Sequence, residues 1–287
     1  MAGGFRERAF IGLQHLLPQH ALSRLVGALA GSRIGFLRRA LIGAFLRNYP
    51  VVLAEAARTD PADYDSFNDF FTRRLRPDAR PPDPDPRAVL CPVDGLVSQS
   101  GRIEDGALLQ AKGIRFSASA LLGGDATTAA EFNGGEFATL YLAPHNYHRI
   151  HMPSAGTLRF ANFVPGDLFS VNAATAAAVP SLFARNERIA CLFDTAHGPM
   201  AVVLIGALFV GSMSLAWAGA VRPGVRRMVT ELPARDPFIA LDRGAELGWF
   251  NMGSTVIVMF APHGPSLIGG LAPGSAVRVG QRLATPR

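Results

Sequence analysis

Apolar side chains recur at helical spacing through the first fifty residues of the chain. The pattern predicts helices over residues 5 to 17 and 21 to 48, with breaks at Pro18 and at Gly31 and Ser32. Arginines interrupt each candidate span before about 18 apolar residues accumulate, so a transmembrane helix does not fit. No small-residue cleavage site ends a compact apolar segment, which argues against a signal peptide. We therefore expect amphipathic helices that lie in a membrane interface or, alternatively, cap a soluble core.

The pattern changes to short β-like runs in the second part of the chain. Residues 60 to 77, DPADYDSFNDFFTRRLRP, predict a short helix with an aromatic face, and a proline-rich linker follows as far as Arg87. The later runs are AVLCPVDGLVSQSG, FATLYLAP, GTLRFANFVPG, RIACLFDT and TVIVMFAP, separated by Gly and Pro. They predict an α+β protein with a β-rich, barrel-like core and N-terminal amphipathic helices. We divide the chain into a helical segment, residues 1–60, and a larger domain, residues 61–287.

One stretch, residues 195 to 221, contains no Asp, Glu, Lys or Arg. On length alone it qualifies as a membrane span. Gly and Ser residues divide it into AVVLIGALFV and LAWAGAV, each of strand length. We expect two buried strands, and a membrane-inserted helix is the alternative that the sequence leaves open.

Positive charge is concentrated in the predicted N-terminal helices. The first fifty residues contain Arg6, Arg8, Arg24, Arg33, Arg38, Arg39 and Arg47. With one acid, Glu7, these give +6, which equals the net charge of the whole chain, so the remainder is neutral overall. A basic arm usually binds nucleic acid or an anionic membrane surface. Because this arm is also rich in Phe, Leu and Ile, the membrane is favoured over nucleic acid.

Composition limits the chemistry that the chain can perform. Lys112 is the only lysine, so a lysine Schiff base could form only there. Cys91 and Cys191 stand far apart without a CxxC pattern, which fits a reducing compartment and argues against a disulfide framework or zinc site. We expect both cysteines to be small buried hydrophobes.

Three of the seven histidines fall within APHNYHRIHMP, residues 143 to 153. They are His145, His148 and His151. Pro144 follows a predicted strand, so we expect a short helical turn, on which His148 and His151 would share a face. Structural histidines and a metal site are the competing interpretations, but no cluster of Cys or carboxylates with ligand spacing lies nearby in the sequence.

Asp94 and Ser254 are further candidates. Asp94 lies in CPVDGLVS, where Asp-Gly is a turn pair, and beside a histidine it would fix the tautomer of the ring. Ser254 follows Gly253 in WFNMGSTVIVMF, at the start of a predicted strand. Residue types alone do not select these residues, because almost any chain of this length contains an Asp, His and Ser trio.

Several longer motifs resemble bacterial phosphatidylserine decarboxylases. NMGSTVIVMF is similar to the Leu-Gly-Ser-Thr signature of that family, with Met252 in place of the usual leucine. The other motifs, in the same order as in the family, are FNDFFTRRLRP, PVDG, YHRIHMP, VPGDLFSVN and LFARNERIACLFDT. The resemblance runs from the N-terminal segment nearly to the C-terminus.

The resemblance implies a proenzyme that cleaves itself between Gly253 and Ser254. The Ser254 hydroxyl would attack the preceding glycine carbonyl, and the ester would eliminate to leave a pyruvoyl group, the covalent cofactor, at the start of a small chain 254–287. The family's triad carries over as Asp94, His151 and Ser254, with His151 as base and Asp94 as its orienter. His148 is the implied proton donor in decarboxylation, and His145 has no assigned role. No metal is implied.

The implied activity converts phosphatidylserine to phosphatidylethanolamine through a Schiff base. The implied partners are phosphatidylserine, an anionic membrane surface and the association of the large and small chains, and a homodimer is left open. The enzyme would be peripheral on the cytoplasmic side of the cell membrane, with residues 1–60 membrane-associating and residues 61–287 catalytic. A pyruvoyl decarboxylase of another amine-bearing lipid, an uncleaved serine hydrolase and a non-catalytic membrane-binding module are the alternatives.

Overall fold

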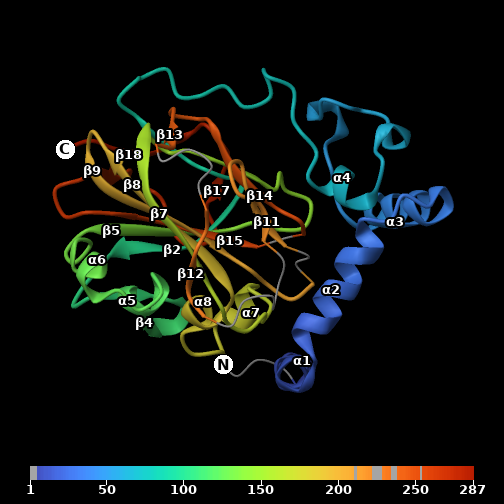
Figure 1. Cartoon of the computed structure of the whole chain (residues 1–287), viewed down its shortest axis with the longest axis horizontal. Coiled ribbons are helices and arrows are strands. Elements are labelled where there is room, and N and C mark those ends of the chain that lie inside the picture. Colours follow the sequence, from blue (N-terminus) through green and yellow to red (C-terminus); the bar gives the residue numbers. More distant parts are fainter. Residues whose placement is uncertain (1–4, 210–211, 222–227, 234–237, 253) are drawn as a thin grey trace.

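Three N-terminal helices lie along one side of a body made mostly of strands (Figure 1). The computed structural model describes residues 5–209, 212–221, 228–233, 238–252 and 254–287. The helices are α1 (Phe5–Leu16), α2 (Gln19–Ala30) and α3 (Gly35–Asn48). Pro18 precedes α2 and Gly31 ends it, as the sequence pattern predicts. No helix within the described ranges is both long and apolar enough to cross a membrane.

Helix α2 turns polar side chains toward the body of the protein. Gln19 and Ser23 are buried, whereas Leu25 and Leu29 are 57% and 46% exposed. The Gln19 Oε1 atom accepts a hydrogen bond from the Leu168 N–H at 2.6 Å. This arrangement is the reverse of a helix that buries its apolar stripe in a soluble core.

Helix α1 docks in the same way. The side chain of Gln14 is 1% exposed, and its Oε1 atom accepts a hydrogen bond from the Ser170 N–H at 2.7 Å. On the same helix, Leu13 and Leu16 are 52% and 83% exposed. Amide groups therefore hold both helices to the body, and leucines remain on the outside.

Helix α4 (Phe67–Phe71) joins the N-terminal helices to the body, and Ser66 caps it by accepting from the Asp69 N–H. Its aromatic face packs on Phe45 of α3, with ring centroids 5.4 Å apart for Phe67. The predicted short aromatic helix is thus confirmed. Two single 3₁₀ turns, η1 (Leu53–Glu55) and η2 (Pro61–Asp63), precede it.

A nine-stranded, antiparallel sheet forms the centre of the body. Its order is β12-β7-β8-β9-β15-β5-β2-β17, with β13 also paired to β7. The strands are β2 (Gly95–Arg102), β5 (Glu136–Tyr141), β7 (Gly156–Val164), β8 (Arg188–Thr195), β9 (Gly198–Ile205), β12 (Thr230–Glu231), β13 (Ala240–Leu241), β15 (Thr255–Phe260) and β17 (Ala276–Val277).

Three smaller sheets and several short helices complete the body. Strands β6 (Arg149–His151), β10 (Met213–Leu215), β11 (Gly219–Val221) and β14 (Glu246–Phe250) form one sheet, β1 (Val89–Leu90), β16 (Ser266–Leu267) and β18 (Arg282–Thr285) another, and β3 (Ala107–Leu109) and β4 (Arg115–Ser117) a hairpin. The short helices are η3 (Ala111–Gly113), α5 (Ala118–Leu121), α6 (Ala126–Ala130), α7 (Ala173–Ala176) and α8 (Leu182–Arg185). The predicted α+β class is confirmed, and the strand order traced through the described residues does not close into a barrel.

The uncharged stretch, residues 195 to 221, is built from strands, as expected. Strand β9 lies in its first half, and β10 and β11 form an antiparallel hairpin in its second half. The sequence predicts one strand where the hairpin lies, and this detail is wrong. Gly219 has a positive φ of 71°, which suits the reversal between β10 and β11. Residues 210 and 211 lie outside the described residues.

Strand β15 lies inside the large sheet, because β5 pairs with one of its edges and β9 with the other. Its residues are all buried and alternate between the two apolar clusters on either side of the sheet. Val256, Val258 and Phe260 face one cluster, and Ile257 and Met259 face the other. Each fully buried aliphatic side chain contributes about 1.5–3 kcal/mol. The residue that opens this strand is therefore held firmly.

Candidate active site

Ser254 lies at the point where β15 begins. Its carbonyl accepts a hydrogen bond from the Leu142 N–H at 2.9 Å, which extends the pairing of β15 with the end of β5. The residue is 1% exposed, and its buried Oγ atom meets no hydrogen-bonding group in the described part of the chain. A buried hydroxyl without a partner is costly. Gly253, the other half of the predicted cleavage site, lies outside the described residues.

An apolar cavity of about 310 Å³ adjoins Ser254. Helices α3 and α4 contribute Phe45, Phe67 and Phe71 to its wall, and Phe209, which is 41% exposed, also lines it. The other lining residues are Tyr49, Tyr141, Leu142, Pro144, Ser170, Val171, Asn172, Ala207, Leu208 and Met252. The cavity thus lies between the serine and helices α3 and α4.

His148 is fully buried, and its ring packs on Phe71, with centroids 4.1 Å apart. Because the Asn146 carbonyl can only accept, the Nδ1–H of His148 donates to it, at 2.8 Å. The Nε2 atom then carries a lone pair, and no described group bonds to it. Burial, followed by the charge of Arg73, lowers the pKa of His148 to about 3. The imidazole is therefore neutral at pH 7.

His151 lies in β6 and faces away from His148. Its Nδ1–H donates to the Gly244 carbonyl at 2.8 Å, and its Nε2 accepts from the Tyr147 hydroxyl at 3.0 Å. Burial lowers the pKa of His151 as well, and outweighs the opposing hydrogen bond to Gly244. Both ring nitrogens of His151 are thus occupied, and no hydrogen bond between described atoms joins this ring to Ser254.

The predicted helical turn at Pro144 is wrong. The Asn146 N–H donates to the Ala143 carbonyl at 2.9 Å, and the Asn146 Oδ1 accepts from the Ala143 N–H at 2.7 Å. This tight turn leads directly into β6, which pairs with β14. On a strand, residues three apart point to opposite faces, so His148 and His151 do not share one.

Asp94 is 5% exposed and forms an ion pair with Arg80. The Arg80 Nε atom donates to both carboxylate oxygens at 3.0 Å, and Nη2 donates to Oδ2 at 2.6 Å. The Val279 N–H donates to Oδ1 at 2.9 Å, and Arg80 also binds Glu55 at 2.8 Å. The structure therefore places Asp94 against Arg80 and not against the ring of His151, although the His151 N–H donates to the Pro92 carbonyl at 2.9 Å.

His145 lies beside a second cavity, of about 330 Å³, that Asp94 and Arg80 also line. Its carbonyl accepts a hydrogen bond from Arg73 at 3.0 Å. No contact with the described residues gives its ring a role in catalysis. Throughout the described ranges, no three His, Cys, Asp or Glu side chains gather as a metal site would require.

Cys91 and Cys191 are fully buried free thiols, in agreement with the sequence-based expectation. Burial raises the pKa of the Cys91 thiol to about 12 and raises that of Cys191 as well. Neither cysteine is a nucleophile at neutral pH.

Four site residues were not found from the sequence: Arg80, Tyr147, Asn68 and Asn251. Arg80 lies in the proline-rich linker, which looks like a spacer, and Tyr147 lies inside the histidine motif without a charge to mark it. The amides of Asn68 and Asn251 bond to each other at 3.0 Å although 183 residues separate them. No local pattern in the sequence signals such a contact.

Comparisons with known proteins cover almost the whole chain. A family model described as "Phosphatidylserine decarboxylase" matches residues 67–285, and one described as "PSD" matches residues 9–50. A protein named "Phosphatidylserine decarboxylase proenzyme" from Pseudomonas putida is 54% identical over 284 residues, which cover 98% of this chain and 99% of the relative. A protein of the same name from Bordetella pertussis is 53% identical over 285 residues, covering 98% of this chain and 96% of the relative.

Proposed function

The chain belongs to the phosphatidylserine decarboxylase family and is a decarboxylase that converts phosphatidylserine to phosphatidylethanolamine, and we propose that its reactive group is a pyruvoyl made from its own Ser254. The observation that carries the proposal is the buried Ser254 hydroxyl, which has no hydrogen-bonding partner among the described residues and adjoins an apolar cavity. A small ketone fits this place better than a hydroxyl does, because it leaves no donor unsatisfied.

The pyruvoyl group arises by cleavage of the bond between Gly253 and Ser254. The Ser254 Oγ attacks the Gly253 carbonyl carbon, the C–N bond breaks, and the hydroxyl proton passes to the released nitrogen, which leaves an ester. Loss of the Ser254 Cα proton then breaks the Cβ–Oγ bond, so Gly253 departs as a carboxylate and dehydroalanine remains. Tautomerisation and addition of one water release one ammonia and leave the ketone.

His151 is our proposed base for this cleavage, with Asp94 as the group that supports it. Its lowered pKa keeps the ring neutral, and the Nδ1–H bond to Gly244 leaves Nε2 as the acceptor. The Tyr147 hydroxyl occupies Nε2, so His151 must exchange that hydrogen bond for the hydroxyl of Ser254. Arg80 occupies the carboxylate oxygens of Asp94, so Asp94 does not bond to the His151 ring. Its negative charge nevertheless favours the imidazolium form of His151.

His148 is our proposed proton carrier in decarboxylation. The pyruvoyl group supplies a ketone that binds the substrate amine and a conjugated carbonyl that takes up the electrons released with CO₂. The Nε2 atom of His148 passes a proton, taken up as the substrate binds, to the carbon that CO₂ leaves. The unpartnered Nε2 beside Phe71, itself a wall of the Ser254 cavity, supports this role.

Residues 1–60 form the proposed membrane-binding segment, and residues 61–287 the catalytic domain. Docking of α1 and α2 through Gln14 and Gln19 leaves their leucines facing outward, as binding at a lipid interface requires. Arg24 on α2, Arg33 between α2 and α3, and Arg39 and Arg47 on α3 are exposed as well. Each contributes about 1 kcal/mol near an anionic leaflet. We place the protein peripherally on the cytoplasmic face, where phosphatidylserine enters the apolar cavity from the membrane.

The two chains formed by cleavage stay together in this account. Chain 254–287 supplies β15 to the middle of the large sheet and β17 to its edge, and β16 and β18 to another sheet. The Asp94 carboxylate also accepts from the Val279 N–H, across the proposed division. Separation would expose strand edges and apolar faces, so we expect the two chains to part only on unfolding.

Reductive trapping with phosphatidylserine tests the proposed cofactor. Incubation with the lipid and cyanoborohydride should inactivate the enzyme and add to chain 254–287 the mass of the lipid, or of its decarboxylated product, less one oxygen, because one water is lost and two hydrogens are gained. Denaturing mass spectrometry measures the adduct, and phosphatidylcholine, which has no primary amine, is the control lipid. An adduct on chain 1–253 would contradict the proposal. Competition with other amine-bearing lipids tests whether phosphatidylserine is the preferred substrate.

Replacement of the outward leucines tests the membrane-binding segment. We expect Leu16→Asn, Leu25→Asn and Leu29→Asn together to weaken binding to phosphatidylglycerol vesicles by at least tenfold. Each leucine gains about 0.8 kcal/mol of binding free energy for every CH₂ group that it buries in lipid, and asparagine loses this gain. Vesicle sedimentation measures the change. Leu109→Asn is the matched control. Leu109 is 39% exposed but lies in β3, away from the N-terminal helices in the sequence, so this variant should bind vesicles like the wild type. Equal binding by the triple variant and the wild type would rule out this surface.

A further inference from the structure

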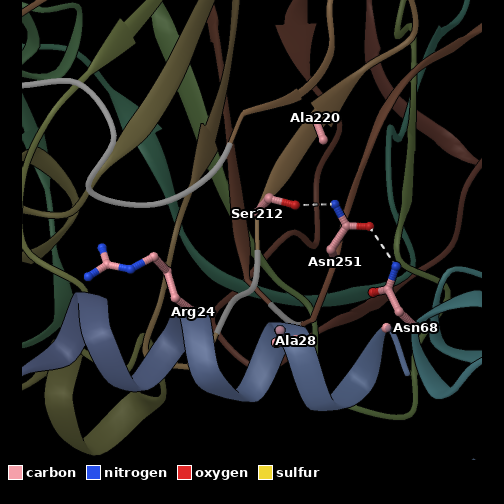
Figure 2. Close-up of a pocket in the computed structure, with 8 residues that line it drawn as sticks. Arg24, Ala28, Asn68, Ser212, Ala220 and Asn251 are labelled. Atoms are coloured by element: carbon pink, nitrogen blue, oxygen red, sulfur yellow. Dashed lines mark hydrogen bonds between the residues drawn. The ribbon is translucent and has the colours of Figure 1, made fainter. Parts of the chain in front are cut away.

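The segment before Ser254 is anchored by the side chain of Asn251. Figure 2 shows the Asn251 amide between Ser212 and Asn68. Its Nδ2 donates to the Ser212 Oγ at 2.6 Å and to the Ser214 Oγ at 3.0 Å, and its Oδ1 accepts from the Asn68 Nδ2 at 3.0 Å. The Asn251 N–H also donates to the Ser212 carbonyl, at 2.9 Å. Four hydrogen bonds, to α4, to β10 and to Ser212 just before β10, thus fix this one residue.

Ser254 is fixed equally firmly on the other side of the cleavage site. Its carbonyl is bonded to the Leu142 N–H, and β15 continues into paired strands on both edges. Only Met252 and Gly253 connect Asn251 to Ser254. The chain has few conformations available between two such close anchors.

Met252 adopts a backbone conformation that non-glycine residues rarely occupy. Its φ is 100°, and its side chain packs on the aromatic cluster formed by α3 and α4. A positive φ brings the Cβ of an L-residue into conflict with its own backbone. Such conformations persist only where the surroundings enforce them. The hydrogen bonds of Asn251 and the pairing at Ser254 provide this enforcement.

We propose that Asn251 is a positioning residue that holds Met252 under backbone strain and so promotes self-cleavage. The inference rests on the proposed cleavage between Gly253 and Ser254. In the peptide, one atom, the nitrogen, separates the Gly253 carbonyl carbon from the Ser254 Cα. In the ester, two atoms, Oγ and Cβ, separate them. The connection between the anchors becomes one atom longer when the acyl group moves to oxygen, which relieves the strain and favours the ester.

Loss of the anchor should slow cleavage. We expect Asn251→Ala to reduce the rate of conversion to two chains by about tenfold. This is the rate factor that follows if the strain energy of one residue, at the low end of its usual values, no longer lowers the barrier to cleavage. Cell-free synthesis of the full chain, sampled over time on denaturing gels, measures the rate. Asn133→Ala is the matched control, because Asn133 is an exposed asparagine that accepts one hydrogen bond from the Gly106 N–H. It should mature at the wild-type rate.

Substitutions at Met252 separate strain from ordinary structural support. Met252→Ala removes the side chain but keeps Cβ, and should cleave at close to the wild-type rate. Met252→Gly also removes Cβ, allows φ of 100° without conflict, and should cleave about tenfold more slowly than Met252→Ala. In a Ser254→Ala background, where neither variant is cut, the Gly variant should melt at the higher temperature, the reverse of the usual order.

The outcomes distinguish this inference from the proposed function. If the wild-type chain itself stays uncut, self-cleavage fails and the inference fails with it. If the wild type is cut but Asn251→Ala is cut equally fast, or Met252→Gly matches Met252→Ala in both rate and melting temperature, only the role of the strain is overturned.

Discussion

Ser254→Ala should leave every molecule as a single chain of 287 residues without decarboxylase activity. The substitution removes the hydroxyl that attacks the Gly253 carbonyl and the oxygen whose loss creates the ketone. Alanine fits the buried position and removes a hydroxyl without a partner in the described residues, so the fold should persist. Denaturing mass spectrometry and CO₂ release from phosphatidylserine measure the two effects.

A serine elsewhere in the same small chain provides the control. Ser275 is half-buried, and its hydroxyl donates only to the Gly270 carbonyl in the described structure, so Ser275→Ala should be cut and active like the wild type. Two-chain protein from Ser254→Ala would exclude Ser254 as the nucleophile. Full activity of an uncut Ser254→Ala chain would exclude the pyruvoyl group.

His151→Ala and His148→Ala should fail at different stages. Without its base, His151→Ala should remain a single chain. His148→Ala should mature to two chains, but its decarboxylation rate should fall by about 10²- to 10⁴-fold, the usual contribution of a proton-transfer group. Densitometry of the two chains and CO₂ release per pyruvoyl group separate the two defects.

Tyr147→Phe sharpens the test of His151. The substitution keeps the aromatic ring beside His151 but removes the hydroxyl that occupies Nε2. Release of this nitrogen should leave maturation at least as fast as in the wild type. If His148→Ala blocks maturation and His151→Ala permits it, the division of roles is reversed, and the unpartnered Nε2 of His148 is the base for cleavage.

Periodicity in the sequence predicts the main elements well, because each follows from local spacing. The continuous apolar, β-branched run within residues 255–260 marks β15, and Pro18 and Gly31 mark the ends of α2. Periodicity does not say which face of a helix points inward. Leu25 and Leu29 form an apolar stripe that the usual rule would bury, yet α2 docks through its polar side chains.

The histidine motif shows where local prediction fails. The sequence around Pro144 permits a helical turn, but pairing with β14, about 100 residues later, draws residues 149–151 into a strand. That pairing turns His148 and His151 in opposite directions. Contacts of this kind depend on the whole fold, and so does the pairing of Asp94 with Arg80, which comes from a segment that looks like a linker.

The motifs did identify Ser254 as a candidate, and the structure adds the surroundings that make it reactive. A buried hydroxyl, an apolar cavity and a strained Met252 converge at one end of β15. The anchor that Asn251 provides is a property of the folded chain, since its partners come from α4, from β10 and from Ser212 just before β10.

The mass of the purified wild-type protein under denaturing conditions tests self-cleavage most directly. The account predicts two species, residues 1–253 and residues 254–287, with the smaller one lighter by one ammonia than the simple hydrolysis product. An active protein with the mass of the uncut chain, or a small chain that begins with an intact serine, would contradict it.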